Sequence, residues 1–362
     1  IVLYPFITVL VAGAFILASL ERVFNVSEVK PTYRLSLLTA LAFLLVATLP
    51  LLAHLGHPER ALEILFTPKF DSAMAMFGFV YAWYLMAVLL LEIWFDYRKD
   101  FVLLSKSAKG LKKLFYTILT FGVDNISPRS LEIDEKIGRA ITIIGIPSAF
   151  LLHGYVGFIF GSVKANPWWS TTLMPVIFLM SAMVSGIAMV MLVYMVTQWL
   201  RRQPIDLPCV DTIRLYLINI FLIDFSLEML DLIHRIYTAE ESFDIISILM
   251  SNNLFWTQFV VQIILGTLIP ISLLAVSFLF SANPGIRKKL YVVASILTLI
   301  GIFAMRWNVV VGGQLFSKSF LGFTTYKLSL IGPEAYIAAG IAVLPFIILG
   351  ILLYLLPPWE KE

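Results

Sequence analysis

The sequence predicts an all-α membrane protein that crosses the bilayer about nine times. Of its 362 residues, 60% are hydrophobic and 14% are charged, whereas soluble domains contain about 45–50% apolar and about 25% charged residues. Nine stretches hold the roughly 20 apolar residues that a helix needs to cross a bilayer. Open sheet edges cannot be satisfied in lipid and no alternating barrel pattern is present, so the stretches are predicted as helices. This composition excludes a disordered chain, a nucleic-acid binder and an ordinary soluble enzyme.

Four spans form a predicted front bundle within residues 1–162. They cover residues 2–24, 33–55, 72–95 and 137–160. Arg22 lies near the end of the first, the second closes on His54 and His57, and Asp71 opens the third. A lysine-rich loop, 96–136, leads to the fourth span, and part of it (111–121) has the pattern of an amphipathic surface helix. Because the chain opens on Ile1 within an apolar run, we expect it to start inside a longer protein.

Four further spans form a predicted rear bundle within residues 172–312, and one more helix follows. They cover residues 172–200, 212–237, 254–280 and 290–312, and the additional C-terminal helix covers 335–356. Small residues of the fifth span, from Ser181 to Ala188, suit close helix packing. The sixth span carries acidic residues, the seventh carries two glutamines, and the eighth ends in a polar stretch from Arg306 to Gln314.

The positive charges predict the orientation. The loops on the side opposite Ile1, here called the Y side, hold nineteen of the 26 lysines and arginines. The loops on the side of Ile1, here called the X side, hold the other seven. The positive-inside rule therefore places the Y side, with the 96–136 loop and the C-terminus, in the cytoplasm.

Polar side chains within predicted spans mark candidate sites, because ionisable groups are costly in lipid. In the front bundle these are three histidines near the X side: His54, His57 and His153. His153 lies about 12 Å inside the X end of its helix, at about 1.5 Å per residue. A histidine at an interface needs no special role, so His54 and His57 are equally consistent with surface residues.

In the rear bundle, Asp224, Glu228 and Asp231 lie on one face of the sixth span, because residues three, four and seven apart share a helix face. They rise from the middle of the bilayer to the X side. Such a ladder predicts a proton path, and a structural ion-pair network with Arg235 and Arg306 is the alternative. Trp168 and Trp169 follow Asn166-Pro167, and they either anchor the chain at the interface or wall a ligand cleft.

The sequence limits which cofactors this chain holds by its own side chains. Its one cysteine, Cys209, excludes a disulfide framework, a structural zinc site and a cysteine-ligated iron–sulfur cluster. A haem needs two histidines that face each other, and His54 with His153 is the candidate pair. This haem site is a minor alternative to a chain without haem. We therefore expect no metal site, and no glycine-rich nucleotide motif is present.

Four stretches of the chain resemble the NrfD family, also called the polysulfide-reductase (PsrC) membrane-subunit family. They are Ala-Gly-Ala-Phe-Ile-Leu at 12–17, Leu-Gly-His-Pro-Glu-Arg-Ala at 55–61, the stretch from His153-Gly154-Tyr155 to Asn166-Pro167-Trp168-Trp169, and residues 306–314. The third stretch is the most specific, and it is most similar to the DsrP-type branch found in Dsr sulfite-reduction-linked membrane complexes. Val11 stands where some relatives carry a histidine, and Ala75 to Phe77 stand where some carry an acid.

The resemblance implies a quinone-interacting subunit of a respiratory complex in the cytoplasmic membrane of a prokaryote. Menaquinone or menaquinol would bind non-covalently in the front bundle, with no haem or iron–sulfur cluster in this chain. A ferredoxin-like iron–sulfur subunit would dock on the extracytoplasmic face, with a multihaem cytochrome c as a further candidate partner. Two other classes stay open: an ion-translocating subunit without quinone, and a passive membrane anchor.

These expectations assign residues to three roles. Residues that exchange protons with the quinone are His153, His54, His57 and Tyr155, and their surround is Arg60, Glu59, Asp71, Trp168 and Trp169. A proton path, which would couple electron transfer to membrane potential, is formed by Asp224, Glu228, Asp231, Arg306, Gln258 and Gln262. The chain is not expected to be catalytic alone.

Overall fold

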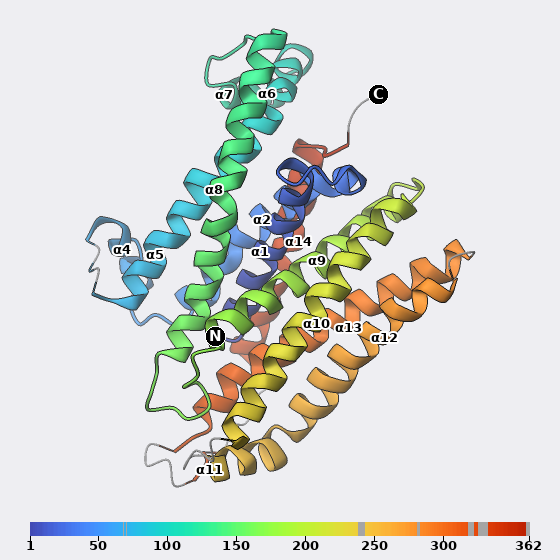
Figure 1. Cartoon of the computed structure of the whole chain (residues 1–362). Coiled ribbons are helices and arrows are strands. Elements are labelled where there is room, and N and C mark those ends of the chain that lie inside the picture. The colour runs from blue at the N-terminus through green and yellow to red at the C-terminus, as the bar shows by residue number, and fades with distance from the viewer. Residues whose placement is uncertain are drawn as a thin grey trace.

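The computed structural model describes residues 1–67, 69, 71–237, 243–280, 283–317, 322–324 and 332–359. Over these residues its regular secondary structure is helical, apart from one isolated antiparallel bridge between Phe316 and Phe323. The α-helices are α1 (Leu3–Arg22), α2 (Tyr33–Ala47), α3 (Leu49–Leu52), α4 (Glu63–Phe66), α5 (Ala73–Trp83), α6 (Leu90–Ser107), α7 (Leu111–Leu119), α8 (Pro128–Gly161), α9 (Met174–Leu200), α10 (Leu207–Tyr237), α11 (Phe243–Ile248), α12 (Ile269–Val276), α13 (Pro284–Gln314) and α14 (Pro333–Leu355). The all-helical prediction is confirmed (Figure 1).

Shorter helical segments complete several of the spans. Turns of 3-10 helix are η1 (Ser27–Thr32), η2 (Pro58–Arg60) and η6 (Ser277–Phe280). Segments of π-helix are η3 (Tyr84–Leu89), η4 (Leu249–Asn253) and η5 (Phe255–Leu268). As a result, α5, η3 and α6 form one continuous span, and η5, α12 and η6 form another. A π-helical turn adds a residue to the helical repeat and occurs often at functional sites.

Eight of the nine predicted spans are helices long and apolar enough to cross a membrane, counted over the described residues. The ninth, predicted at 212–237, is α10, whose 31 residues would measure about 46 Å. This helix runs beside α9 (Figure 1). It differs from the other eight because its charged side chains are spread along the helix, whereas those of α8, for example, all lie before residue 140. The six in α10 are Asp211, Arg214, Asp224, Glu228, Asp231 and Arg235.

The connection predicted as a loop at 96–136 is mostly helical, so that prediction was wrong. The third span continues to Ser107, and α8 begins at Pro128, nine residues before the predicted start at 137. The reason is a buried ion pair between the two helices: Arg98, 1% exposed, donates from Nε to Asp134 at 2.7 Å. Charged residues that suggest a solvated loop in the sequence are therefore buried as an ion pair between two helices. The amphipathic helix predicted within 111–121 is confirmed as α7.

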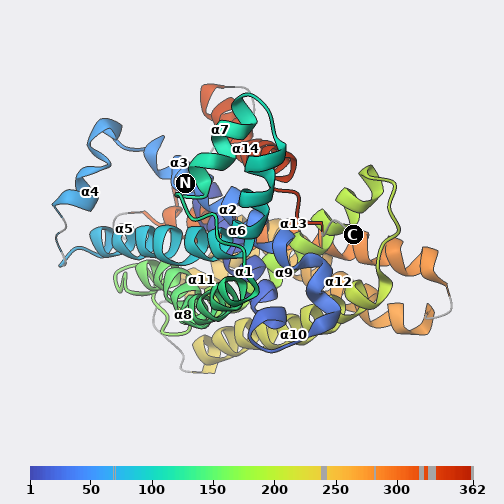
Figure 2. The ribbon, with the colours of Figure 1, turned by 90° about the horizontal axis from the view of Figure 1, so that it is seen from above.

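The centre of the molecule is formed by α1, α2 and α9. Helix α9 packs against α1 and α8 on one side and against α10 and α13 on the other, so it joins the predicted front and rear bundles. Seen from above, α14 and α10 lie at opposite edges of the molecule (Figure 2). At the crossing of α1 and α9, Gly13 faces Gly186, and a Cβ on Gly13 would lie 2.5 Å from the carbonyl oxygen of Ala182. Glycine is needed there because the two backbones touch.

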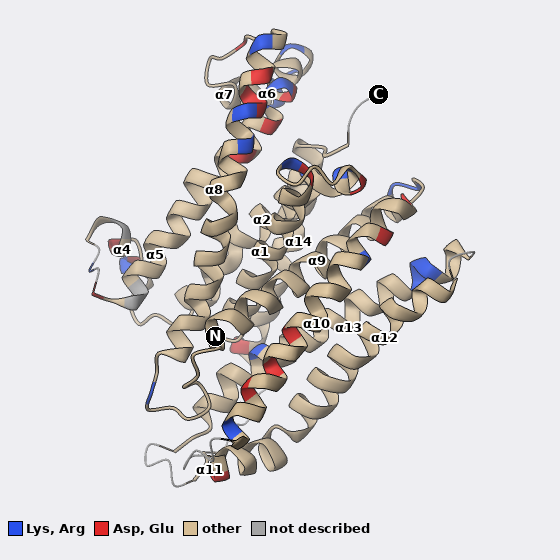
Figure 3. Cartoon of the chain, viewed as in Figure 1, with Lys and Arg blue, Asp and Glu red and all other residues tan. Residues whose placement is uncertain are grey.

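The charged residues separate by depth along the helices. Lysines and arginines gather with acids on the upper ends of α6 and α8 and on α7, which form the Y end (Figure 3). A second group of charges lies inside the lower half, on α10 and α13, toward the X end (Figure 3). Lys318, Lys327 and Lys361, which enter the charge count by side, lie outside the described residues.

Candidate functional site

The front bundle holds His153 in a closed position between α8 and α1. The side chain is 1% exposed. Its Nδ1 lies 2.8 Å from the carbonyl oxygen of Ala149, and its Nε2 lies 2.5 Å from that of Thr8. A neutral imidazole donates one hydrogen bond and accepts one, yet both partners here are acceptors. In this conformation His153 links the two helices through these backbone contacts. That His153 contacts a quinone stays a prediction.

An aromatic cluster lies beside this link. The ring of Tyr4 packs edge-on against Phe77 at 5.5 Å, and Phe77 stacks on Tyr155 at 6.3 Å. The phenol oxygen of Tyr4 is buried and has no hydrogen-bond partner among the described residues. Thr8, whose carbonyl faces His153, donates its hydroxyl to the carbonyl of Tyr4 at 2.8 Å. His153 therefore connects to the turn of α1 that carries Tyr4.

The other predicted front residues lie at the X surface. His57 is exposed and pairs with exposed Glu59 at 2.9 Å. Exposed Arg60 donates to Glu63 at 2.8 Å, and these hydrogen bonds lower the pKa of the Glu63 carboxyl. His54 and Asp71 are exposed as well. The structure brings Tyr155 to the aromatic cluster and leaves this group on the exposed rim, apart from that cluster.

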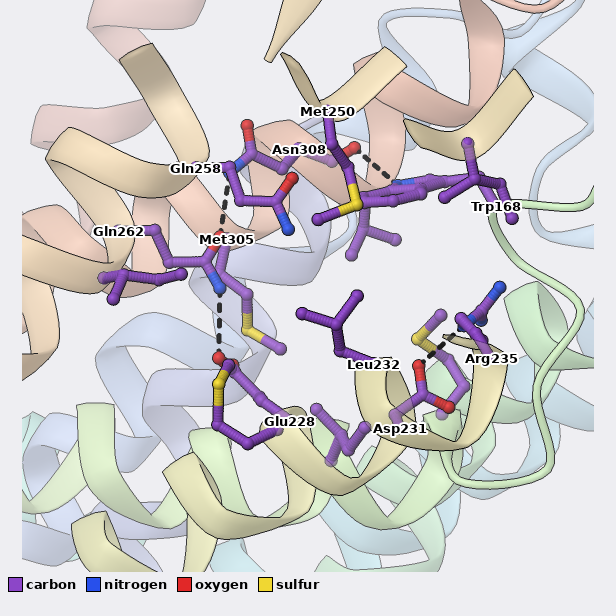
Figure 4. Close-up of a pocket in the computed structure, with 16 residues that line it drawn as sticks. Trp168, Glu228, Asp231, Leu232, Arg235, Met250, Gln258, Gln262, Met305 and Asn308 are labelled. Carbon is purple, nitrogen blue, oxygen red and sulfur yellow. Dashed lines mark hydrogen bonds and ion pairs between the residues drawn. The ribbon is translucent and has the colours of Figure 1, made fainter. Parts of the chain in front are cut away.

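The rear bundle contains a cavity of about 100 Å³ near its X end (Figure 4). Its apolar wall includes Met174, Met229, Met250, Met305, Leu232 and Ile263. Its polar lining includes Asp231 and Arg235 and a chain of hydrogen bonds across three helical segments (Figure 4). Asn308 donates to Gln262 at 2.8 Å, and Gln262 donates to Glu228 at 3.2 Å. Gln258 also lines the cavity, and its amide oxygen has no hydrogen-bond partner among the described residues.

The remaining ladder residues have separate partners. Asp231 pairs with Arg235 at 3.0 Å and accepts from Thr171 at 2.5 Å, so this carboxylate is satisfied as an ion pair. Arg306, 0% exposed, donates to the hydroxyl of Ser181 at 2.5 Å and lies over the Phe178 ring at 3.8 Å. Asp224 is 2% exposed, and its Oδ1 has no hydrogen-bond partner among the described residues.

The two tryptophans fix the loop before α9 onto α13. Trp168 donates from Nε1 to the carbonyl of Asn308 at 2.9 Å, and Trp169 donates to that of Val309 at 2.6 Å. Trp168 also lines the rear cavity (Figure 4). The structure therefore places Trp168 with the rear residues rather than with the front site.

The sequence alone does not single out Tyr4, Asn308 and Ser181. Asn308 lies within the polar stretch that ends the eighth span, which is a signal that could have found it. Tyr4 is a phenol inside an apolar run, but only the structure shows that it lacks a partner. Ser181 is assigned to close packing, yet it also receives a hydrogen bond from Arg306. No group of three or more His, Cys, Asp or Glu side chains suited to a metal ion occurs within the described part of the chain.

Comparison with known proteins gives a consistent set of relatives. A selenate reductase subunit of Mesobacillus selenatarsenatis is 38% identical over 200 residues, which cover 54% of this chain and 46% of that protein. A Protein NrfD homolog of Haemophilus influenzae is 25% identical over 270 residues, 73% of this chain and 77% of the relative. Protein NrfD of Escherichia coli is 25% identical over 201 residues, 55% of this chain and 59% of the relative. The match thus spans less than half the length of the selenate reductase protein.

One family profile matches most of the chain. It is described as polysulphide reductase, NrfD, and it matches residues 1–318, which include all four motifs. The match also includes the aromatic cluster and the rear cavity. This multi-pass membrane protein therefore belongs to the polysulphide reductase NrfD family.

Proposed function

We propose that this protein is the quinone-interacting membrane subunit of a respiratory oxidoreductase complex. Family membership and similarity to a selenate reductase protein support a role in a multi-subunit reductase. The observation that carries the quinone role is the buried, unpartnered phenol of Tyr4 within an aromatic cluster. An unsatisfied buried donor costs about 1–3 kcal/mol, so a site of this kind favours a ligand that accepts a hydrogen bond.

The residues of the front cluster fit a quinone head group. A bound quinone accepts two electrons and two protons, and a quinol returns them. The Tyr4 hydroxyl would donate to a carbonyl oxygen of the ring, and the rings of Phe77 and Tyr155 would flank its faces. His153 would position Tyr4 through Thr8, and a turn of its imidazole away from Thr8 would free a nitrogen for proton exchange.

Access to this cluster depends on α5. The cluster is closed in this structure, because the phenol oxygen of Tyr4 is buried. Helix α5 packs mainly against α4, α8 and η3, and η3 is π-helical. This outer helix is the element whose displacement from α1 and α8 would open the cluster to lipid, from which a menaquinone would enter.

The experiment is organic extraction and mass spectrometry of the complex purified through this chain, under detergent conditions that retain lipid. We expect one quinone or quinol per complex, and no haem band from this subunit in a reduced-minus-oxidised spectrum. A complex that retains lipid but carries no quinone would contradict the proposal. It would favour an ion-translocating or anchoring subunit instead.

A second candidate function, proton translocation, is favoured by the rear cavity. Buried Asp224 and the chain Glu228–Gln262–Asn308 lie within the long helical segments of the rear bundle, away from their Y ends. Such groups are costly in a membrane, so they mark a candidate functional site. The Asp231–Arg235 pair supports the structural alternative for that end of the ladder.

The finer features of the complex are also part of the proposal. Electrons would pass to a ferredoxin-like iron–sulfur subunit on the X face, next to the exposed residues around His57 and Arg60. The X face would lie outside the cytoplasmic membrane of a prokaryote, as the charge count indicates. The DsrP-type resemblance suggests sulfur chemistry, whereas the relative named for selenate suggests another oxidised acceptor.

A further inference from the structure

The Y end of the molecule contains a second polar site that neither the quinone cluster nor the rear cavity uses. A cavity of about 750 Å³, here called the Y basin, is lined by Arg22, Tyr33, Arg34 and Asp96, among others. Its rim includes exposed Glu28 and Lys30, so solvent reaches it.

Glu92 lies behind the wall of the Y basin. Its side chain is 0% exposed, in the interior of the span formed by α5, η3 and α6. One carboxylate oxygen, Oε1, accepts from the Thr142 hydroxyl at 2.7 Å and lies 3.4 Å from the hydroxyl of Tyr33. The other, Oε2, has no hydrogen-bond partner among the described residues.

The charged groups around Glu92 lie on the side of the basin. Arg22 of α1 contacts the Tyr33 hydroxyl and lies 3.3 Å from Asp96, one turn from Glu92 on α6. Asp96 also pairs with Arg34 of α2 at 2.7 Å. Helix α8 presents the neutral hydroxyl of Thr142 to Glu92. Arg22 and Arg34 are both engaged with Asp96, so neither arginine forms an ion pair with Glu92 in the described part of the chain.

This arrangement differs from a purely structural ion pair. A buried carboxylate that lacks a direct cation is costly in its charged form and readily takes up a proton. Tyr33 connects Glu92 to the Y basin, because it lines the basin and its hydroxyl faces Oε1. Toward the X side, the next polar group of the same span is the buried, unpartnered phenol of Tyr84, eight residues or about 12 Å away.

We propose that Glu92 is a proton-exchange site for the Y face of the membrane, reached from the Y basin past Tyr33. A hydronium ion in the basin gives one proton to the Glu92 carboxylate, which forms the O–H bond of the carboxylic acid and leaves one water molecule, and the reverse step returns the proton to water. The inference rests on the proposed function in one respect only: the protons that Glu92 exchanges with the Y side would be those that quinone chemistry takes up or releases.

The test is infrared difference spectroscopy of the purified complex during a pH titration, in H₂O and in D₂O. We expect a carboxylic-acid C=O band that titrates and shifts in D₂O. The band should be absent in Glu92→Gln and retained in Glu28→Gln, the matched control on the rim of the basin. Thr142→Val should move the band to higher frequency, because the Thr142 hydroxyl hydrogen-bonds to the same carboxyl group; this variant keeps the test valid if Glu92→Gln does not assemble.

The outcomes separate this inference from the proposed function. A band that titrates in a complex without quinone would support the proton site and overturn the quinone role. Quinol-dependent turnover with no such band, or with a band unchanged in both Glu92→Gln and Thr142→Val, would overturn the proton site and leave the quinone role intact.

Discussion

At the residue scale, the phenol of Tyr4 makes the sharpest prediction. Tyr4→Phe keeps the aromatic packing against Phe77 and removes only the hydroxyl. A neutral hydrogen bond contributes about 0.5–1.5 kcal/mol, so we expect the KM for quinol to rise about two- to tenfold. Tyr97→Phe is the matched control, since that hydroxyl already donates to the Leu356 carbonyl near the Y end. Equal KM values for wild type and Tyr4→Phe would remove Tyr4 from the quinone site.

The link made by His153 gives a second residue-scale prediction. His153→Ala removes both contacts to backbone carbonyls and leaves a cavity between α8 and α1. We expect quinol-dependent turnover to be lost while the chain still assembles in the membrane, because Tyr4 is no longer held in place. Turnover and the amount of complex in the membrane are the two measurements. His234→Ala, at an exposed histidine of α10, controls for the loss of an imidazole. Turnover like that of wild type in His153→Ala would show that the residue only packs.

The same residues show what a sequence can and cannot predict about a site. The cost of polar groups in lipid led directly to His153 and to the acids of α10. Hydrogen-bond partners are a different matter, because they depend on which helices become neighbours. The pairing of Asp231 with Arg235 follows from helix spacing. The contact of Arg306 with Ser181 and the unpartnered Oε2 of buried Glu92 do not follow from it.

At the element scale, the crossing of α1 and α9 explains why the core is so tightly packed. A methyl group on Gly186 would collide with the backbone of Gly13 and lie 2.6 Å from the amide nitrogen of Ala14. Overpacking of this kind costs about 1–3 kcal/mol, so we expect Gly186→Ala to lower the midpoint of thermal unfolding in detergent. Gly340→Ala in α14 meets no atom within 4 Å and should be neutral or slightly stabilising. If both variants unfold at the wild-type temperature, close backbone contact is not what holds the two helices together.

Element boundaries show where sequence reasoning falls short. Apolar length defined the spans well, since every predicted span corresponds to a helix or to a continuous run of helical segments. It failed at the Y ends of the third and fourth spans, because charged residues there are buried against each other, as Arg98 and Asp134 are. The π-helical segments were also missed, because an extra residue per turn leaves no mark in an apolar sequence.

At the scale of the whole molecule, the charge asymmetry predicts which face is cytoplasmic. Lys109 and Lys164 are exposed at the Y and X ends, and the native Cys209 is buried. With a membrane-impermeant maleimide on intact cells, we expect labelling of Lys164→Cys but not of Lys109→Cys. Permeabilised cells should label both, which is the control for reactivity. Labelling of only Lys109→Cys on intact cells would reverse the orientation and place the quinone cluster on the cytoplasmic side.

Asp224 tests whether electron transfer in the front bundle is coupled to proton movement in the rear bundle. This carboxyl is buried in the middle of α10, and Oδ1 has no partner within the described residues, whereas Glu228 one turn away continues into Gln262 and Asn308. Asp224→Asn keeps the shape of the side chain but cannot ionise, so a proton path through α10 would be broken there. In proteoliposomes we expect the variant to retain quinol-dependent electron transfer and to move fewer protons per electron.

Asp211→Asn is the matched control on the same helix, because that carboxylate pairs with Arg287 at the Y end. An unchanged proton-to-electron ratio in Asp224→Asn would make the ladder structural, and any proton transfer would then have to pass through the front bundle, where Glu92 lies behind the wall of the Y basin.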